Sequence, residues 1–249
     1  MTSQARLKYL RSLSRKKVRR EEGLLLVEGL RLVQDAVACG YAQEIYAGPD
    51  VPLPRVPRDL PVHTLEQKDV GALADTETPQ GVFALCRDPC AALGDASLPP
   101  DALVLVAHGV ADPGNLGTLV RSAAALGAHA VVTTPGTVEP TNPKAVRASA
   151  GALFRCAVLR GELEQLRELG FRILVASTNG TPLAELRTRP RRLALVVGNE
   201  PRGVDSQAEQ TADGTVAIPL SAGVESLNVA AAAAVLLYAL AALPVEARE

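Results

Sequence analysis

The C-terminal segment 218–240, IPLSAGVESLNVAAAAAVLLYAL, constrains the fold more than any other part of the chain. It predicts a helix that follows Ser226 as its N-cap and ends at Leu243, because Pro244 cannot continue a helix. From Val229 onward this helix is apolar on nearly every face, so we expect it to be buried in its own domain or against a second subunit. A polar loop precedes it at the end of a short strand, which is where α/β proteins place ligands. An ordinary loop before a buried helix explains the segment equally well.

The rest of the chain alternates strand and helix patterns in two parts. Residues 1–88 contain short apolar runs at 24–27, 44–47, 62–65 and 82–86, separated by helical spacing, which predicts a small α/β domain. The stretch 89–101 is rich in proline and is expected to be a linker. Residues 102–249 show a longer strand–helix alternation with short connections, which predicts a parallel sheet with helices on both faces.

The composition is that of a globular protein, with 47% apolar and 21% charged residues. No apolar run is long enough to predict a membrane span, and the basic N-terminus lacks the apolar core of a secretory signal, so we expect a cytoplasmic protein. The four cysteines are scattered without a nearby histidine partner. They are interpreted as reduced thiols, and no metal site is expected.

The net charge of −1 hides a basic N-terminus, because the first twenty residues contain no acidic residue. Leu7, Leu10 and Leu13 have helical spacing within residues 5–20, with basic residues between them. The candidates for phosphate binding in this segment are Arg11, Arg15, Lys16, Lys17 and Arg19. A nucleic-acid contact and a solvated basic tail are both compatible with this pattern.

Two further loops carry polar residues at the ends of apolar strands. In the first, residues 108–128, Asn115 is expected to cap a helix or to bind a ligand, and Arg121 lies six residues further along that helix. The alternative for Arg121 is a structural ion pair with a nearby carboxylate. The second loop, LVVGNEPRGV at 195–204, has Gly198, Asn199 and Glu200 directly after a buried strand. Neither a G-x-G-x-x-G loop nor a Walker loop is present.

Three segments carry the pattern: NLGTLVRSAAALG, LVVGNEPRG and IPLSAGVESLNVAAAAAVLLY. They resemble the three motifs of the SpoU/TrmH family of RNA ribose 2′-O-methyltransferases. The stretch EPTNPKAVRASAGALFRCAV at 139–158 is similar to the family segment between the first two motifs. LLVEGLRLVQDAV and TPQGVFAL resemble the family's ribosomal-protein-like substrate-binding domain, so the resemblance covers nearly the whole chain.

This resemblance implies a parallel-sheet catalytic domain with a deep C-terminal trefoil knot, a homodimer, and S-adenosylmethionine as cofactor. By motif position, it implies catalytic roles for Asn115, Arg121, Glu200, Ser226 and Asn228. The cofactor would be held around Leu195, Val197, Gly198, Asn199, Glu200, Ile218, Leu220, Ser226 and Leu227. RNA would bind to the basic N-terminal residues named above and to Lys144 and Arg147, although a surface role explains Lys144 equally well.

The implied reaction is methyl transfer from S-adenosylmethionine to a ribose 2′-hydroxyl. The family assigns activation of that hydroxyl to the arginine of the first motif, here Arg121, which acts as a base or as a cation that lowers the hydroxyl pKa. The separate N-terminal domain favours 23S ribosomal RNA over transfer RNA as the substrate. A non-catalytic dimeric RNA-binding protein and a small-molecule α/β enzyme are the alternatives from other functional classes.

Overall fold

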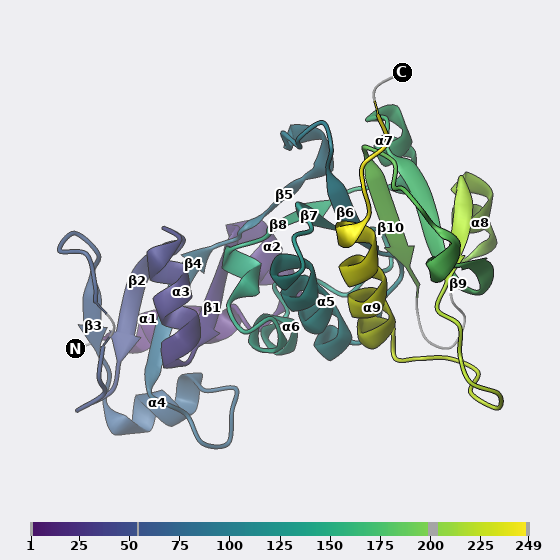
Figure 1. Cartoon of the computed structure of the whole chain (residues 1–249). Helices are drawn as coiled ribbons and strands as arrows, with labels where there is room; N and C mark the ends of the chain where they lie inside the picture. Colours follow the sequence, from purple (N-terminus) through teal and green to yellow (C-terminus); the bar gives the residue numbers. More distant parts are fainter. Residues whose placement is uncertain (1, 54, 199–203, 248–249) are drawn as a thin grey trace. The chain divides into compact units, whose positions relative to one another are not determined.

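The computed structural model describes residues 2–53, 55–198 and 204–247, and for residues 206 and 207 it describes only the backbone. The chain divides into two compact units. The N-terminal unit contains residues 1–89 and Glu139–Arg155, and the C-terminal unit contains Cys90–Val138 and Cys156–Glu249. Each unit has its own sheet and is described separately below (Figure 1).

The N-terminal unit is built on a four-stranded sheet in the order β1-β4-β2-β3. Strand β4 pairs antiparallel with β1 and β2, and β2 pairs parallel with β3. The strands are β1 (Leu24–Glu28), β2 (Ala42–Ala47), β3 (Val62–Thr64) and β4 (Val82–Arg87). They coincide within two residues with the four segments named in the sequence. The segments of β1 and β4 bury side chains on the sheet, whereas β3 buries none.

The basic N-terminal segment forms two helices, α1 (Gln4–Ser12) and α2 (Lys16–Glu22), rather than one continuous helix. The break falls where Arg15 adopts an extended backbone and becomes the N-cap residue of α2. Leu7, Leu10 and Leu13 are buried in the core of this unit together with Phe83 and Tyr46. The apolar spacing therefore predicted the buried face correctly. Two further helices, α3 (Leu30–Ala38) and α4 (Gln67–Leu73), complete the first part of the unit.

Residues 139–155 belong to the N-terminal unit, although the sequence pattern placed them in the catalytic domain. They form α6 (Pro143–Ala148) and a short 3₁₀ helix at Ala152–Phe154. Charged contacts hold this segment to the first part of the unit. Glu139 pairs with Arg19 and Arg20, and Arg155 pairs with the buried Asp35.

The C-terminal unit is built on a seven-stranded sheet in the order β11-β9-β10-β6-β7-β8-β5. All of these neighbours pair in parallel, which confirms the predicted parallel α/β sheet. The strands are β5 (Cys90–Ala92), β6 (Leu103–Ala107), β7 (Ala130–Thr133), β8 (Ala157–Arg160), β9 (Arg172–Pro182), β10 (Leu193–Val197) and β11 (Gly214–Ala217). Strand β5 lies in the stretch 89–101 that was expected to be a linker, and Leu93, directly after it, is fully buried.

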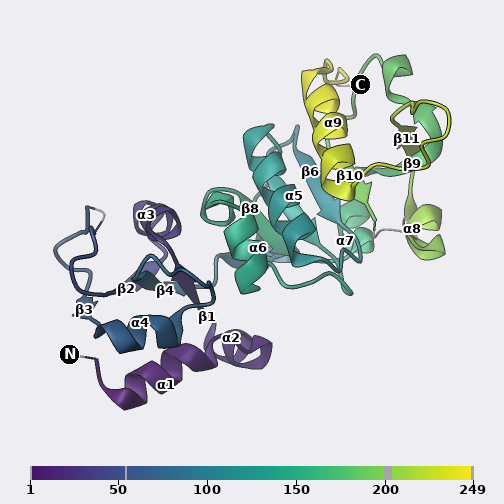
Figure 2. The ribbon, with the colours of Figure 1, turned by 90° about the horizontal axis from the view of Figure 1, so that it is seen from below.

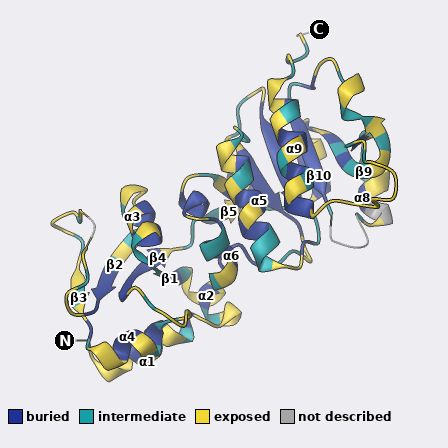
Figure 3. Ribbon diagram, turned by 60° about the horizontal axis from the view of Figure 1, so that its bottom comes forward, coloured by how far each residue is buried: buried dark blue, intermediate teal, exposed yellow. Residues whose placement is uncertain are grey.

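Helices cover both faces of this sheet. On one face α5 (Pro113–Ala125) and α9 (Val229–Ala242) lie side by side, as Figures 1 and 2 show. On the other face α7 (Leu163–Glu168) and α8 (Ser206–Thr211) contribute Leu163, Leu166 and Ala208 to a core with Val104 and Val196. Strand β10 is buried along its whole length behind α5 and α9 (Figure 3).

The C-terminal helix differs from its prediction at its start, and only part of its surface is buried within this chain. Its N-cap is Asn228 rather than Ser226, since the Asn228 side chain accepts hydrogen bonds from the backbone N–H groups of Ala230 and Ala231. Leu236, Leu237 and Leu240 are buried, but Val235 is 44% exposed and Tyr238 is 70% exposed. The helix therefore has an apolar solvent-facing side within this single chain.

Candidate active site

A cavity of about 740 Å³ lies against the middle of β9 and the ends of β10 and β11. Its wall contains the ends of β10 and β11, with Val197, Gly198 and Ile218, and the loop 220–228 that leads into α9. The carboxyl ends of parallel strands are the usual place for a ligand in an α/β sheet. The volume lies within the range of about 300–1,000 Å³ typical of small-molecule sites.

The structure places most of the predicted cofactor residues in this cavity. Its lining includes Val197, Gly198, Ile218, Leu220, Ser226 and Leu227. Leu195 does not line it, because it lies two residues before the strand end and is completely buried in β10. Asn199 and Glu200 lie outside the described residues. Cofactor contacts at the lining residues remain predictions.

Sequence reasoning missed the part of the cavity formed by β9 and α8. Val175, Ala176, Ser177 and Thr178 line it along β9, and Glu209 lines it from α8. Strand β9 is irregular here, because its pairing with β11 shifts register between Thr215 and Val216. The hydroxyls of Ser177 and Thr178 follow an apolar run, which is the same signal that marked the other two loops.

Asn115 and Asn228, which are 113 residues apart in the sequence, are joined by a direct hydrogen bond. The Asn228 Nδ2 group donates to Asn115 Oδ1 over 3.0 Å. Asn115 lies in the first turn of α5 and is not its cap; Asp112 caps this helix by accepting from the Asn115 backbone N–H. The structure therefore brings together two of the predicted catalytic residues at the N-termini of α5 and α9.

The other predicted catalytic residues have different surroundings. Arg121 is exposed on α5, about 9 Å along the helix axis from Asn115. Among the described residues, no ion pair or hydrogen bond reaches its guanidinium group, so the structural ion pair considered from the sequence is not found there. Ser226 is exposed and lines the cavity, and Glu200 lies outside the described residues. The catalytic roles remain predictions.

His108, directly after β6, connects two other loops of the C-terminal unit. Its Nδ1 lies 3.0 Å from Thr134 Oγ1, and its Nε2 lies 3.1 Å from Asp205 Oδ2. Asp205 also caps α8 by accepting from the Ala208 backbone N–H. This histidine was not singled out in the sequence. It links the loop after β7 to the start of the helix that carries Glu209.

The predicted RNA-binding residues are mostly exposed, but Arg19 is not. The exposed residues are Arg11, Arg15, Lys16, Lys17 and Lys144, and Arg147 is partly exposed with an ion pair of 2.5 Å to Asp75. Arg19 is 4% exposed, donates to the carbonyl groups of Leu13 and Ser14, and pairs with the equally buried Glu139 at 3.2 Å. The guanidinium is enclosed by its own unit, which does not support RNA binding by Arg19, and that role stays an untested prediction.

Two of the cysteines are unsuited to act as nucleophiles at neutral pH. Burial raises the pKa of the Cys156 thiol to about 11, and burial alone raises the pKa of the Cys86 thiol further. A thiol must lose its proton to react, so both remain protonated. None of the helices in the described part of the chain combines the length and apolar character needed to cross a membrane.

Comparison with known families assigns both parts of the chain. The model of the SpoU rRNA Methylase family matches residues 102–238, more than half of the chain. The chain belongs to the SpoU rRNA methylase family. A second model, described as an MRM3-like substrate binding domain, matches residues 4–84.

Individual members of the SpoU family resemble this chain along almost its whole length. The 23S rRNA (guanosine(2553)-2′-O)-methyltransferase RlmP of Bacillus subtilis is 36% identical over 243 residues, which cover 94% of each chain. The SpoU methyltransferase AviRb of Streptomyces viridochromogenes, solved in complex with AdoMet, matches with a TM-score of 0.83 and 25% identity, covering 96% of this chain and 97% of that one. An AdoMet-bound rRNA methyltransferase from Sinorhizobium meliloti matches with a TM-score of 0.84 and 25% identity, covering 96% of both chains.

Proposed function

We propose that this protein is a cytoplasmic enzyme that transfers a methyl group from S-adenosylmethionine to a ribose 2′-hydroxyl of 23S ribosomal RNA. The observation that carries the proposal is the cavity at the middle of β9 and the ends of β10 and β11. It is bordered by Asn228, which is hydrogen bonded to Asn115. The chain belongs to the SpoU rRNA methylase family, and a similar protein is named as a 23S ribosomal RNA 2′-O-methyltransferase.

The cavity suits S-adenosylmethionine in size and in chemistry. Val175, Val197, Ile218 and Leu227 offer apolar surface to an adenine ring and to the methionine chain. The cavity also offers hydrogen-bond acceptors for ribose hydroxyls and for cationic groups. They are the carboxylates of Glu209 and Glu225 and the hydroxyls of Ser177 and Ser226. When bound, S-adenosylmethionine supplies a methyl group on a sulfonium that a ribose oxygen attacks in line, while the sulfur–carbon bond breaks.

Arg121 is the residue we expect to make the ribose hydroxyl reactive. A guanidinium group does not lose its proton at physiological pH, so its useful property is its positive charge. Placed beside an RNA phosphate and the 2′-hydroxyl, it lowers the hydroxyl pKa and stabilises the negative charge that develops on oxygen. Its exposure on α5, with no ion pair from any described residue, leaves the charge available for the RNA.

The active form is expected to be a homodimer through the α5–α9 face. Four exposed residues of α9 follow one another at spacings of three and four residues: Ala231, Val235, Tyr238 and Ala242. Such a stripe normally packs against another surface. Tyr238→Glu would place a charge in this stripe, so we expect it to convert a dimer into a monomer in sedimentation velocity. A monomeric wild-type protein would contradict the assignment.

We also infer that the C-terminal chain forms the trefoil knot expected from the motifs. Strand β11 lies at the edge of the sheet beside β9, whereas the following helix α9 packs against β6 and β10 nearer the centre. The chain between them, residues 218–228, must cross from the edge toward the centre, and it lines the same cavity as Gly198. This crossing supports the knot, and an experimental structure that traces residues 198–228 tests it.

The experiment that tests the function measures methyl transfer from isotope-labelled S-adenosylmethionine to purified ribosomal and transfer RNA. Digestion of the product shows whether the label lies on a ribose 2′-oxygen. We expect label in the large ribosomal RNA, and label confined to transfer RNA would instead support the alternative substrate. Arg121→Ala is expected to lose transfer by at least about 10²-fold while it retains cofactor binding in calorimetry. A fully active Arg121→Ala variant would refute the role of Arg121, and a protein that does not bind the cofactor would refute the function.

A further inference from the structure

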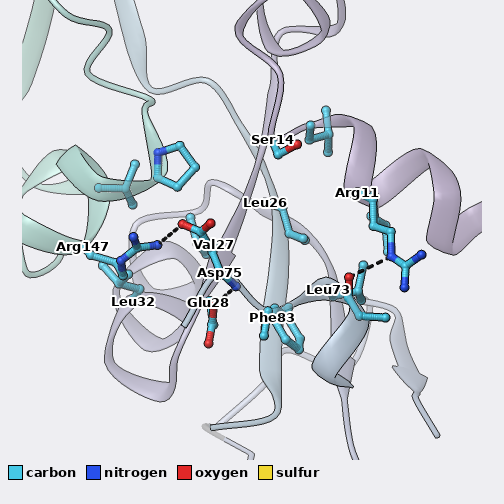
Figure 4. A pocket seen from close by; sticks show the side chains of 16 residues that line it. Arg11, Ser14, Leu26, Val27, Glu28, Leu32, Leu73, Asp75, Phe83 and Arg147 are labelled. Carbon is cyan, nitrogen blue, oxygen red and sulfur yellow. Dashed lines mark hydrogen bonds and ion pairs between the residues drawn. The ribbon is translucent and has the colours of Figure 1, made fainter. Parts of the chain in front are cut away.

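A second cavity, of about 220 Å³, lies entirely within the N-terminal unit (Figure 4). Its walls are apolar and come from four parts of the unit: Leu10 of α1, Leu26 of β1, Leu73 of α4 and Phe83 of β4. Val146 of α6 closes another side. The methyltransferase reaction proposed above does not use this cavity.

The rim of the cavity is charged, in contrast to its walls. Arg11 and Arg147 lie on opposite sides of it in Figure 4. Arg11 Nε donates to the Ala72 carbonyl group over 2.7 Å, which fixes the side chain at the rim. Arg147 is held by Asp75 at 2.5 Å. Glu28 accepts from the Asp75 backbone N–H over 2.9 Å, so both carboxylates have defined positions at the opening.

We propose that this cavity binds one unpaired nucleobase of the RNA substrate, with the neighbouring phosphates on Arg11 and Arg147. The inference rests on the proposed function and identifies a recognition site within the domain that matches a substrate-binding family. The volume is below the range of about 300–1,000 Å³ for whole small-molecule ligands, so it suits a single planar base with its sugar and phosphate outside. Leu26, which is partly exposed, and the accessible edges of Leu32 and Leu73 supply the apolar surface against which an extruded base packs.

The two carboxylates define which edge of a base fits best. Ionised Glu28 and Asp75 only accept hydrogen bonds, so they select N–H groups on the Watson–Crick edge of the base. Guanine presents two such donors side by side, and a carboxylate can accept both. A paired base cannot reach the cavity, because these donors are then occupied and the base is stacked in its helix. The site therefore favours an unpaired guanine.

The proposal is tested by filling the cavity from an exposed position without changing any charge. Ser14 is exposed and lines the opening, whereas Thr78 is exposed and is not part of the lining. Ser14→Trp places a large ring over the cavity, and Thr78→Trp is the matched control. Binding of the full-length variants is measured by fluorescence anisotropy with two hairpin RNAs that differ by one bulged guanosine.

We expect wild type and Thr78→Trp to prefer the bulged hairpin by about tenfold and Ser14→Trp to lose this preference. The salt dependence of Ser14→Trp should equal that of wild type, because no phosphate contact is removed, whereas Arg11→Ala should show a weaker salt dependence. Equal affinity of wild type for both hairpins, or equal affinities of both tryptophan variants for the bulged one, would overturn the proposal.

Methyl NMR spectra with guanosine monophosphate give a second measurement that needs no substrate RNA. We expect shifts at the methyl groups of Leu26, Leu73 and Val146 in Thr78→Trp and none in Ser14→Trp. Shifts confined to other methyl groups would contradict the base site. The methyl-transfer function is checked separately by calorimetry with S-adenosylmethionine. A protein that binds the nucleotide but not the cofactor would refute the function and leave the cavity assignment standing.

Discussion

Arg19 and Arg20 are adjacent arginines that both contact Glu139, and the structure predicts opposite consequences for their loss. Arg19 and Glu139 are each 4% exposed, whereas the Arg20 side chain is 60% exposed. Arg19 also donates to the carbonyl groups of Leu13 and Ser14, at 3.0 and 2.7 Å. Replacing Arg19 by alanine leaves these groups and a buried carboxylate short of hydrogen bonds, whereas replacing Arg20 leaves the buried pair intact.

The magnitudes follow from burial. Removing one partner of a buried ion pair costs about 3–5 kcal/mol, and we expect the lower end for Arg19→Ala because Arg20 still contacts Glu139. The Arg20 side chain is mostly exposed and Glu139 keeps its buried partner without it, so Arg20→Ala should cost about 1 kcal/mol, as for a surface pair. In a chain of this size about 1 kcal/mol shifts the melting temperature by about 2–4 °C, so Arg19→Ala should melt about 6–12 °C below wild type.

The assay is thermal melting followed by circular dichroism, with RNA affinity measured well below both transitions. Each variant loses one positive charge, so a difference in stability between them reports burial and not net charge. If Arg19→Ala were as stable as Arg20→Ala, the assignment of Arg19 as a structural residue would be wrong. A specific loss of RNA affinity in a fully stable Arg19→Ala protein would restore the phosphate-binding role expected from the sequence.

Three further predictions concern packing, capping and pH. A Cβ atom at Gly180 would lie 2.8 Å from the backbone nitrogen of Val216. Gly180→Ala should therefore destabilise the protein by about 1–3 kcal/mol, measured by urea unfolding. Gly71 in α4 has open space around it, so Gly71→Ala should not destabilise the protein in this way. Asn228→Ala should lower the free energy of unfolding by about 1 kcal/mol, because α9 loses its cap. Asn228→Asp should keep the cap and the stability, although it loses the donor to Asn115. Equal destabilisation by both variants would contradict the capping role. Burial, followed by the hydrogen bond to Glu44, raises the pKa of Tyr46 to about 12, so its neutral form is favoured in the folded state and stability should fall as pH rises from about 10 toward 12. Tyr46→Phe should remove this part of the pH dependence, and an unchanged profile would refute it.

The sequence predicted most of the strands because they contain continuous or alternating apolar residues. The parallel sheet of the C-terminal unit and the buried face of α1 follow directly from such patterns. Strand β5 was missed because three residues, Cys90–Ala92, are too short to show a pattern within a proline-rich stretch. The cap of α5 was misplaced, since the sequence suggested Asn115 as a cap, whereas the helix begins at Pro113 with Asp112 as its cap.

The candidate site was predicted only where neighbouring residues carry the signal. The residues that line the larger cavity after β10 and β11 lie in recognisable loops. The burial of Arg19 depends on Glu139, which lies 120 residues further along the chain, and no local pattern reports such a partner. The sequence left open whether α9 is covered by its own domain or by a second subunit, because Val235 and Tyr238 lie on a helix that is apolar on nearly every face. When a helix is apolar on several faces, hydrophobicity alone does not show which of these faces the rest of its own chain covers.

The hydrogen bond between Asn115 and Asn228 explains how distant motifs can form one site. The loop 218–228 is largely exposed, but it is anchored at one end by Ala217 in the sheet and at the other by the capping contacts of Asn228. Asn228 uses its carbonyl oxygen for the helix and its amide for Asn115, so one side chain fixes both the start of α9 and its distance from α5. A loop held at both ends keeps the wall of the larger cavity in place before any ligand binds, and pre-organisation of this kind lowers the cost of binding. The polar side chain of Asn228, beside the apolar C-terminal helix, is therefore a structural anchor of the cavity wall.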